Sequence, residues 1–147
     1  MTVRVRRLEE KDKQAWLSLF KGYIEFYKAS VADEVIELSW QRLMAGAADF
    51  HIGLVAVNET DTPVGLAHVL FHRSTWSPTH YCYLEDLFVD PKQRLKGIGR
   101  ALIEATYREA DARACTRTYW ATQDFNYRAR ALYDQVATKS VFVQYRR

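Results

Sequence analysis

The stretch Tyr81–Leu102, YCYLEDLFVDPKQRLKGIGRAL, decides how this chain is expected to fold. An apolar run leads through a Val-Asp-Pro turn into a basic segment that holds Gly97 and Gly99, and a helix-forming sequence follows. A strand, a glycine loop and a helix in this order present backbone N–H groups to a phosphate. The stretch therefore predicts an anion site at the start of the helix.

Charged residues on both sides of the turn support a site for group transfer. The apolar run carries two acids, Glu85 and Asp86, where a buried strand would ordinarily have none. Four basic residues surround the glycines and would attract a phosphorylated small molecule, although charge alone would also fit a solvated loop; they are Lys92, Arg94, Lys96 and Arg100. An anion cradle beside a partly buried acid is what an enzyme with a phosphorylated cofactor needs.

The composition is that of one globular domain, which we place at residues 1–147. The chain has 147 residues, of which 48% are hydrophobic and 27% are charged, values that exclude a disordered chain. Its net charge of +3 comes with no long basic stripe, so we expect no nucleic-acid partner. The first residues, MTVRVRRLEE, hold no apolar core of a signal peptide, and no segment has the length of a membrane span.

The cysteines and histidines predict neither a metal site nor a secreted protein. Cys82 and Cys115 lack metal-ligand spacing, and a reduced, cytoplasmic protein is the simplest inference. His68 and His72 share one predicted strand without a third ligand at metal spacing, so we interpret them as packing or surface residues.

Apolar periodicity predicts a mixed sheet with helices on both faces. Helical spacing covers residues 11–28, 34–47, 97–113 and 126–137, with Asp33 expected to cap the second helix. Strand patterns cover residues 2–7, 50–58, 63–72, 80–89, 118–122 and 141–145. The strands at 81–89 and 118–122 are joined by a helix, so we expect them to run parallel and side by side.

The glycine segment resembles a known cofactor motif. Arg94-Leu95-Lys96-Gly97-Ile98-Gly99 is similar to the acyl-coenzyme A binding motif of the GNAT N-acetyltransferases, in which Arg or Gln, two residues, Gly, one residue, and Gly or Ala follow one another. The context strengthens the resemblance, because YLEDLFV precedes the motif and Asn126 stands seven residues before Tyr133 on the last helix. The polyamine and histone acetyltransferase-like branch is the most similar, and the element order agrees along the whole chain. Leu95 departs from the usual Gly or Arg.

The resemblance implies a fold and a co-substrate. The fold class would be α/β (α+β), with a mixed, mostly antiparallel central sheet, a parallel strand pair splayed at the cofactor site, and helices on both faces. Acetyl-CoA or coenzyme A would bind as co-substrate, without a metal. The residues implied in its binding are Leu87, Phe88, Val89, Arg94, Leu95, Lys96, Gly97, Ile98, Gly99, Arg100, Asn126 and Tyr133. Gly97 and Gly99 would let the backbone approach the pyrophosphate.

The same resemblance implies an acid and a base. An alkylamine has a pKa near 10 and must be neutral to attack a thioester, so the site needs a proton acceptor. Glu85 matches the family's base, acting directly or through water, and Tyr133 matches the acid that protonates the leaving thiolate. From the residues alone, Glu85 could also be a structural acid and Tyr133 a core aromatic, although a tyrosine can pack in the core and still act through its hydroxyl. Asp86 would point away from Glu85 on an undistorted strand, although a bulge could change that.

We therefore expect an acetyl-CoA-dependent N-acetyltransferase that transfers directly in a ternary complex. The acceptor is a small-molecule or peptide amine, such as a polyamine, a lysine side chain or another primary amine; its weaker candidate contacts are Tyr23, Tyr27, Glu85, Asp86 and Asp124, with Tyr119 and Trp120 near the same opening. A non-catalytic acyl-CoA-binding module and a different nucleotide-phosphate binder remain alternatives, the latter disfavoured because no Gly-Lys-Ser/Thr ending is present. The last apolar segment, Val141–Arg147, could pair with a second copy to form a homodimer.

Overall fold

The structure is a computed structural model that describes residues 3–45, 50–93 and 97–147. Its strands are β1 (Arg4–Arg7), β2 (His51–Val57), β3 (Pro63–His72), β4 (Tyr81–Val89) and β5 (Arg117–Tyr119). Its helices are α1 (Lys13–Phe26), which follows a 3-10 turn η1 (Glu10–Asp12), α2 (Asp33–Met44), α3 (Ile98–Ala112) and α4 (Tyr127–Val136).

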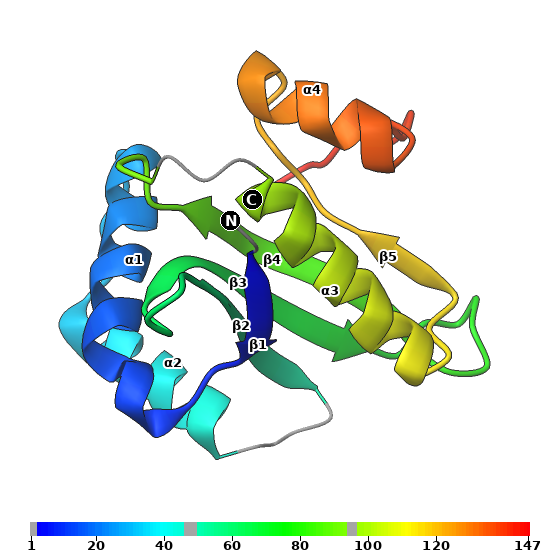
Figure 1. The fold of residues 1–147 in the computed structure, drawn as a ribbon. Helices are drawn as coiled ribbons and strands as arrows, with labels where there is room; N and C mark the ends of the chain where they lie inside the picture. The colour runs from blue at the N-terminus through cyan, green and yellow to red at the C-terminus, as the bar shows by residue number, and fades with distance from the viewer. Residues whose placement is uncertain (1–2, 46–49, 94–96) are drawn as a thin grey trace.

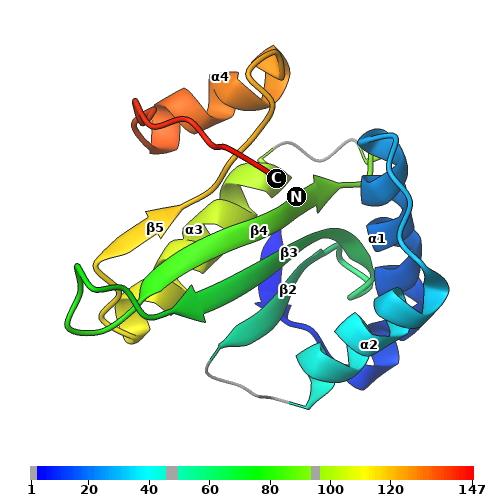
Figure 2. The ribbon, with the colours of Figure 1, turned by 180° about the vertical axis from the view of Figure 1, so that it is seen from behind.

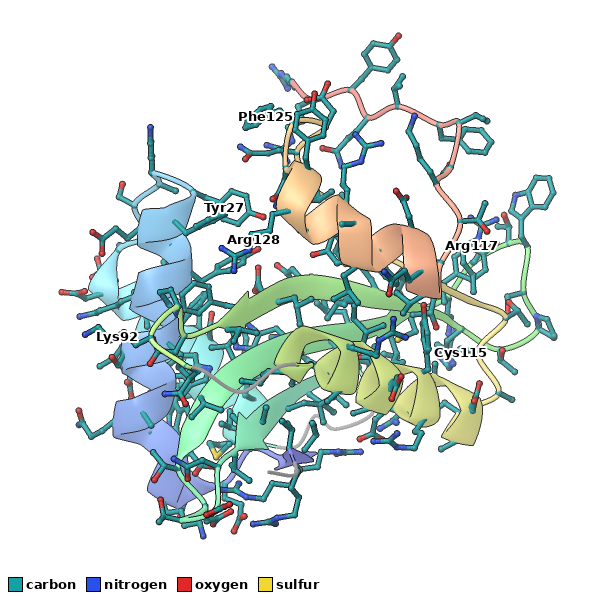
Figure 3. All side chains as sticks on the ribbon, turned by 45° about the horizontal axis from the view of Figure 1, so that its top comes forward. Tyr27, Lys92, Cys115, Arg117, Phe125 and Arg128 are labelled. Carbon is teal, nitrogen blue, oxygen red and sulfur yellow. The ribbon has the colours of Figure 1, made fainter. Side chains whose placement is uncertain are left out.

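The described strands form one sheet in the order β1-β2-β3-β4-β5. Neighbours are antiparallel except β4 and β5, which are parallel as predicted. Helices α1 and α2 cover one face and α3 the other, while α4 lies beyond the end of the sheet (Figures 1 and 2). Figure 3 looks toward that end, where α1 and α4 stand on either side of β4. The predicted mixed α/β fold with helices on both faces is confirmed.

Two apolar clusters hold the helices to the sheet. On the α3 side, Leu102 and Ile103 are fully buried against inward-facing residues of β2 and β3 such as Leu54. On the other side, Trp16 of α1 and Trp40 of α2 pack on the opposite face of the same strands. Because β2 and β3 are covered on both faces, they read as continuous apolar runs without alternation.

A β-bulge interrupts β4 at the acidic pair. Leu84 pairs with Val69 and Asp86 pairs with His68, which leaves Glu85 unpaired between them. Core packing shows that the alternation of side chains shifts by one residue here. Leu84 packs on the α3 side, and the next residue to do so is Leu87, three positions later, where a regular strand would have a spacing of two. Asp86 therefore lies on the α1 face, as its bond to His68 also requires.

The parallel strands separate before β4 ends. The pairing of β4 with β5 stops at Tyr83 and Tyr119, whereas β4 continues to Val89. From Leu84 onward β4 has only β3 beside it among the described strands. The predicted splayed pair is thus present, and it leaves one backbone edge of β4 open below α4 (Figure 1).

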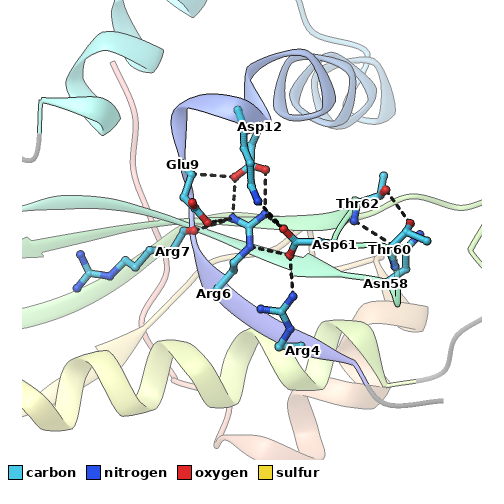
Figure 4. Close-up of polar contacts among 10 residues, drawn as sticks. Arg4, Arg6, Arg7, Glu9, Asp12, Asn58, Thr60, Asp61 and Thr62 are labelled. Carbon is cyan, nitrogen blue, oxygen red and sulfur yellow. Dashed lines mark hydrogen bonds and ion pairs between the residues drawn. The ribbon is translucent and has the colours of Figure 1, made fainter.

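An ionic cluster fixes β1 to the start of α1 and to the β2–β3 turn (Figure 4). Arg6 donates two bonds to Asp12, at 2.8 and 2.9 Å, and a third to Asp61, at 3.0 Å. Asp61 also accepts from Arg4 and Lys11, each at 2.7 Å. The Asp12 side chain is only 2% exposed and that of Arg6 14%, whereas those of Arg4 and Lys11 are 61% and 59% exposed, so the Arg6–Asp12 pair is the buried, structural part of this cluster.

The structure corrects two expectations. The segment predicted as a last strand is irregular, and its apolar side chains are exposed: Val141 by 91%, Phe142 by 88% and Tyr145 by 92%. The physical reason is that β5 is only three residues long and offers little edge for pairing. The expected helix cap was also wrong, because Ala32 holds the N-cap position of α2 and Asp33 is its first residue. There Asp33 still interacts favourably with the helix dipole.

Candidate functional site

The start of α3 has the form of an anion site. Gly97 stands at the N-cap position with φ of 82°, a left-handed conformation that favours glycine. No described residue other than the chain neighbours of Gly97 comes within 4 Å of the position that a Cβ would take there, so the described residues leave the approach open. No described side chain caps the helix, which leaves its first N–H groups available. Arg94, Leu95 and Lys96, predicted to complete the cradle, lie outside the described residues.

The next glycine, Gly99, lies at a close contact between two helices. A Cβ on Gly99 would come within 3.3 Å of Leu132 Cδ2, so this glycine allows α4 to approach α3. Arg100, expected at the cofactor rim, donates to Gln135 of α4. These contacts seat α4 on the helix that begins at the glycine loop, while Lys92 is exposed beside that loop.

Tyr133 lies on α4 with its ring against the segment that follows β5. Its ring centroid is 5.4 Å from that of Trp120 in a T-shaped contact. Burial, with a smaller effect from Tyr27 at the C-cap of α1, raises the pKa of Tyr133 to about 12, so its phenol keeps its proton at neutral pH. Asn126, at the N-cap of α4 as predicted, donates to Thr122 Oγ1 at 3.1 Å.

A cavity of about 760 Å³ opens beside Tyr133. It is bounded by β5 and the residues after it, by α4, and by the irregular segment near the C-terminus. Tyr119, Trp120 and Asp124, the weaker substrate candidates, line it. The hydroxyl of Tyr119 also interacts with His72 Nε2 at 2.6 Å, so that ring is fixed toward β3.

The predicted acceptor contacts on α1 lie beside the acidic pair. The Tyr23 ring contacts those of Tyr27, at 5.0 Å between centroids, and Phe88, at 6.1 Å. Burial, together with the charge of and a side-chain interaction with Asp86, raises the pKa of Tyr23 well above its ordinary value. In Figure 3, Tyr27 and Arg128 of α4 point toward one another. The structure thus places Tyr23 within the electrostatic influence of Asp86 and packs Tyr27 against Tyr23.

Glu85 sits at the bulge and is exposed to solvent. Even so, the atoms around the carboxyl partly desolvate it, and this effect with the nearby Asp86 carboxylate raises its pKa above the ordinary value. A raised pKa is what a carboxylate needs to accept a proton near neutral pH. The residues after the bulge are anchored by packing, Leu87 and Val89 on the α3 side and Phe88 on the α1 side. They therefore offer a ligand mainly their backbone.

Sequence reasoning missed the partners of His68. This side chain is buried, as a packing histidine would be, but both ring nitrogens are engaged. Trp16 Nε1 donates to His68 Nε2 at 2.9 Å, and His68 Nδ1 lies 2.8 Å from Asp86 Oδ2. The available signal was a histidine inside the apolar run GLAHVLF, because a buried imidazole needs hydrogen-bond partners.

The described residues offer neither a metal site nor an activated cysteine. Within residues 3–45, 50–93 and 97–147 no group of His, Cys, Asp and Glu is placed to hold a metal ion. Burial raises the pKa of the Cys82 thiol to about 12 and also raises that of Cys115, so neither is activated as a nucleophile. No helix in the described part of the chain is long and apolar enough to cross a membrane.

Comparison with known sequences agrees with this geometry. Residues 14–137 match the sequence model of the acetyltransferase (GNAT) family. The D-amino-acid N-acetyltransferase HPA3 of Saccharomyces cerevisiae is 36% identical over 143 residues, covering 97% of this chain and 89% of that protein. The thialysine N-epsilon-acetyltransferase of Bos taurus is 30% identical over 149 residues, covering 95% and 85% respectively.

Solved structures share the fold at lower identity. The aminoglycoside N-acetyltransferase AAC(6')-Iy, in complex with CoA, superposes with a TM-score of 0.84 at 18% identity and covers 99% of this chain and 94% of that one. The ribosomal-protein-alanine N-acetyltransferase of Brucella melitensis biovar Abortus 2308 has a TM-score of 0.80 at 19% identity, covering 98% and 97%. At these identities the likeness shows the fold alone.

Proposed function

Because the chain belongs to the acetyltransferase (GNAT) family and is an N-acetyltransferase, we propose that it moves an acetyl group from acetyl-CoA to a primary amine by direct attack in a ternary complex. The observation that carries this proposal is that α4, which holds Tyr133, packs through Leu132 on Gly99 of the uncapped, glycine-started helix α3, beyond the end of the sheet where β4 leaves one backbone edge unpaired. The whole chain would act as one catalytic domain.

The residues present fit coenzyme A. The open approach at Gly97 and the first N–H groups of α3 suit a pyrophosphate. The unpaired edge of β4 near Val89 suits the amide groups of a pantetheine arm, because it offers backbone donors and acceptors. When bound, acetyl-CoA supplies the activated acetyl group as a thioester. The Val89 N–H would polarise its carbonyl.

The directions of the pKa shifts of Glu85 and Tyr133 support their proposed roles. Glu85, with a raised pKa, accepts a proton from the acceptor ammonium, directly or through water. The neutral nitrogen forms the new C–N bond as the C–S bond breaks, and Tyr133 gives its proton to the departing sulfur. The nitrogen then loses its second proton, so that over the whole reaction one proton reaches the thiol and one reaches solvent.

Direct transfer is favoured over a cysteine-bound acetyl group. Cys82 is fully buried and its pKa is raised to about 12. Cys115 follows α3 at the end of the molecule away from Tyr27 and α1 (Figure 3). Neither thiol is in a position to take the acetyl group and pass it to an amine beside Tyr133.

The acceptor is proposed to be a small amine. The two relatives act, by their names, on D-amino acids and on thialysine, which are both small primary amines. Polyamines, lysine side chains in peptides and amino sugars remain candidates for this chain. The acidic pair with Tyr23 and Tyr27 would receive the cationic end of any of them.

The proposal is tested by thiol release from acetyl-CoA with a panel of D-amino acids, thialysine, spermidine, a lysine peptide and an amino sugar. We expect free thiol with at least one amine. Tyr133→Phe should lower kcat by about a hundredfold with little change in coenzyme A affinity. Tyr127→Phe, on the same helix but 74% exposed, is the control and should stay near wild type. Binding of acetyl-CoA without thiol release for any amine would instead indicate a non-catalytic acyl-CoA-binding module.

We also propose that two copies associate through the exposed segment Val141–Tyr145 and that the protein is cytoplasmic. The side chains of Val141, Phe142, Val143 and Tyr145 are all at least 77% exposed, and burying them in a second copy would remove apolar surface from water. Analytical ultracentrifugation should show a dimer for the wild type and a monomer for Phe142→Asp. A wild-type monomer at micromolar concentration would contradict the association.

A further inference from the structure

The hydrogen bonds of His68 fix where its proton lies. The side chain is 4% exposed and sits in the middle of the sheet on the α1 face. The indole Nε1–H of Trp16 can only donate, so His68 Nε2 must accept. A neutral imidazole then carries its proton on Nδ1, and that N–H donates to Asp86 Oδ2 at 2.8 Å. The indole thus selects the tautomer that binds the carboxylate.

Asp86 is held at the boundary between the core and the cleft. Its side chain is 17% exposed, so part of the carboxylate remains accessible while His68 holds one oxygen. On the α1 side, the ring of Phe20 packs edge-on against His68 at 5.0 Å between centroids, and Tyr23 lies beside Phe20 and Phe88. The bulge at Glu85 puts Asp86 on this face immediately beside the proposed base. The position of this charge is set by the bulge in β4 and by His68 of β3, which Trp16 of α1 holds in turn.

We propose that Asp86 binds the ammonium group of the acceptor and that His68 is the positioning residue that holds Asp86 for this task. The inference rests on the proposed function. It gives His68, which does not touch the substrate, the task of positioning Asp86. Trp16, in turn, determines the tautomer from within the core. Glu85, one residue away and not bonded to His68, is left free to take the proton.

The alternative is that His68 only satisfies a polar group in the core. Two amide substitutions separate these readings because they imitate different ring nitrogens. An asparagine amide reaches the position of Nδ1 and can still donate to Asp86, but it leaves the Trp16 indole without its acceptor. A glutamine amide reaches the position of Nε2 and can accept from Trp16, but it leaves Asp86 without its donor. A positioning role therefore predicts a larger amine KM for His68→Gln than for His68→Asn, whereas a purely structural role predicts no such difference in KM.

The test compares steady-state kinetics of His68→Asn and His68→Gln with the amine that the wild type uses best. For His68→Gln we expect the amine KM to rise about tenfold, with the acetyl-CoA KM unchanged and kcat within about threefold, because a bond to a charged group is lost. His68→Asn should keep the amine KM within about threefold yet unfold at lower temperature than His68→Gln. An equal amine KM in both variants, or the larger rise in His68→Asn, would overturn the inference.

Kinetics of two Asp variants and NMR of the His68 imidazole test the inference independently of the His68 substitutions. Asp86→Asn should raise the amine KM at least tenfold, whereas Asp111→Asn, on the exposed end of α3, should leave it unchanged. Nitrogen-15 NMR of the imidazole should show a protonated Nδ1 and an unprotonated Nε2 in the wild type; the reverse would refute the tautomer without recourse to activity. If the wild type acetylates an amine but His68→Gln keeps its KM, the inference fails and the proposed function stands. If no amine is acetylated, the proposed function itself fails.

Discussion

Replacing Asp12 by Asn should destabilise the protein more than any surface charge change. The Asp12 carboxylate accepts from Arg6 at 2.8 and 2.9 Å and from the backbone N–H of Glu9 at 2.8 Å, with its side chain 2% exposed. Removing one member of a buried ion pair costs about 3–5 kcal/mol. Arg6 retains Asp61 at 3.0 Å and Asn keeps one acceptor oxygen, so we expect a loss at the lower end, about 3 kcal/mol.

Urea denaturation followed by tryptophan fluorescence measures this loss. The m-value should not change, because the surface exposed on unfolding is the same. The control is Glu37→Gln, which breaks the Lys13–Glu37 pair at 3.0 Å, where the two side chains are 42% and 47% exposed. An exposed pair contributes about 0–1 kcal/mol. If the two variants lose the same free energy of unfolding, burial does not govern the ionic cluster.

The pH dependence gives a second check on Asp12. Desolvation raises the pKa of this carboxyl, but the bonds from Arg6 and Glu9 outweigh it and the net pKa lies below the ordinary value. A lowered pKa means that the stabilisation is fully present above the unfolded-state pKa of about 4 and is lost as the pH falls through the lower native value. The gap between wild type and Asp12→Asn should therefore narrow below about pH 4. A gap that stays constant to pH 2 would refute an electrostatic origin.

Three further outcomes are expected. The acid limb of the pH profile of kcat/KM should lie at higher pH than for an ordinary glutamate, because Glu85, with its raised pKa, becomes protonated at higher pH. Glu85→Gln should lower the rate and remove this limb. Gly97→Ala, at φ of 82°, should cost about 1 kcal/mol in urea denaturation and weaken coenzyme A binding by calorimetry. Leu102→Ala, fully buried, should lose about 2–5 kcal/mol, whereas Leu38→Ala, 41% exposed, should lose less than about 1.

The arrangement of the sheet was predictable because it depends on patterns near in sequence. Hydrophobic periodicity located the main strands and helices, and a helix between two strands implied the parallel pair. The prediction of a strand at residues 141–145 was wrong for a physical reason. VFVQY has the composition of a strand, but a strand needs an edge, and β5 ends at Tyr119 after three residues. The composition of a segment does not show how long the neighbouring strand is.

The candidate site was predictable in part. The glycine at 97 and the helix carrying Tyr133 followed from the motif and its spacing. The role of Gly99 in helix packing could not be predicted from the motif, because Leu132 contacts it only in the folded chain. The contact between His68 and Asp86 depends on a register that contains a bulge. Alternation alone assigns Asp86 to the wrong face, so no reading of the strand pattern could have paired these two residues.

The bulge has a consequence for changes in chain length. Leu84 and Asp86 already lie on the faces that consecutive residues of a regular strand would occupy. Deleting Glu85 would thus leave every other side chain of β4 on its present face and restore an unbroken ladder. β4 is one residue longer than its packing requires, and the extra residue is the proposed base. A shortened chain should fold at least as readily as the natural one and lack the reaction, which makes this position a point where folding and catalysis favour different lengths of the same strand.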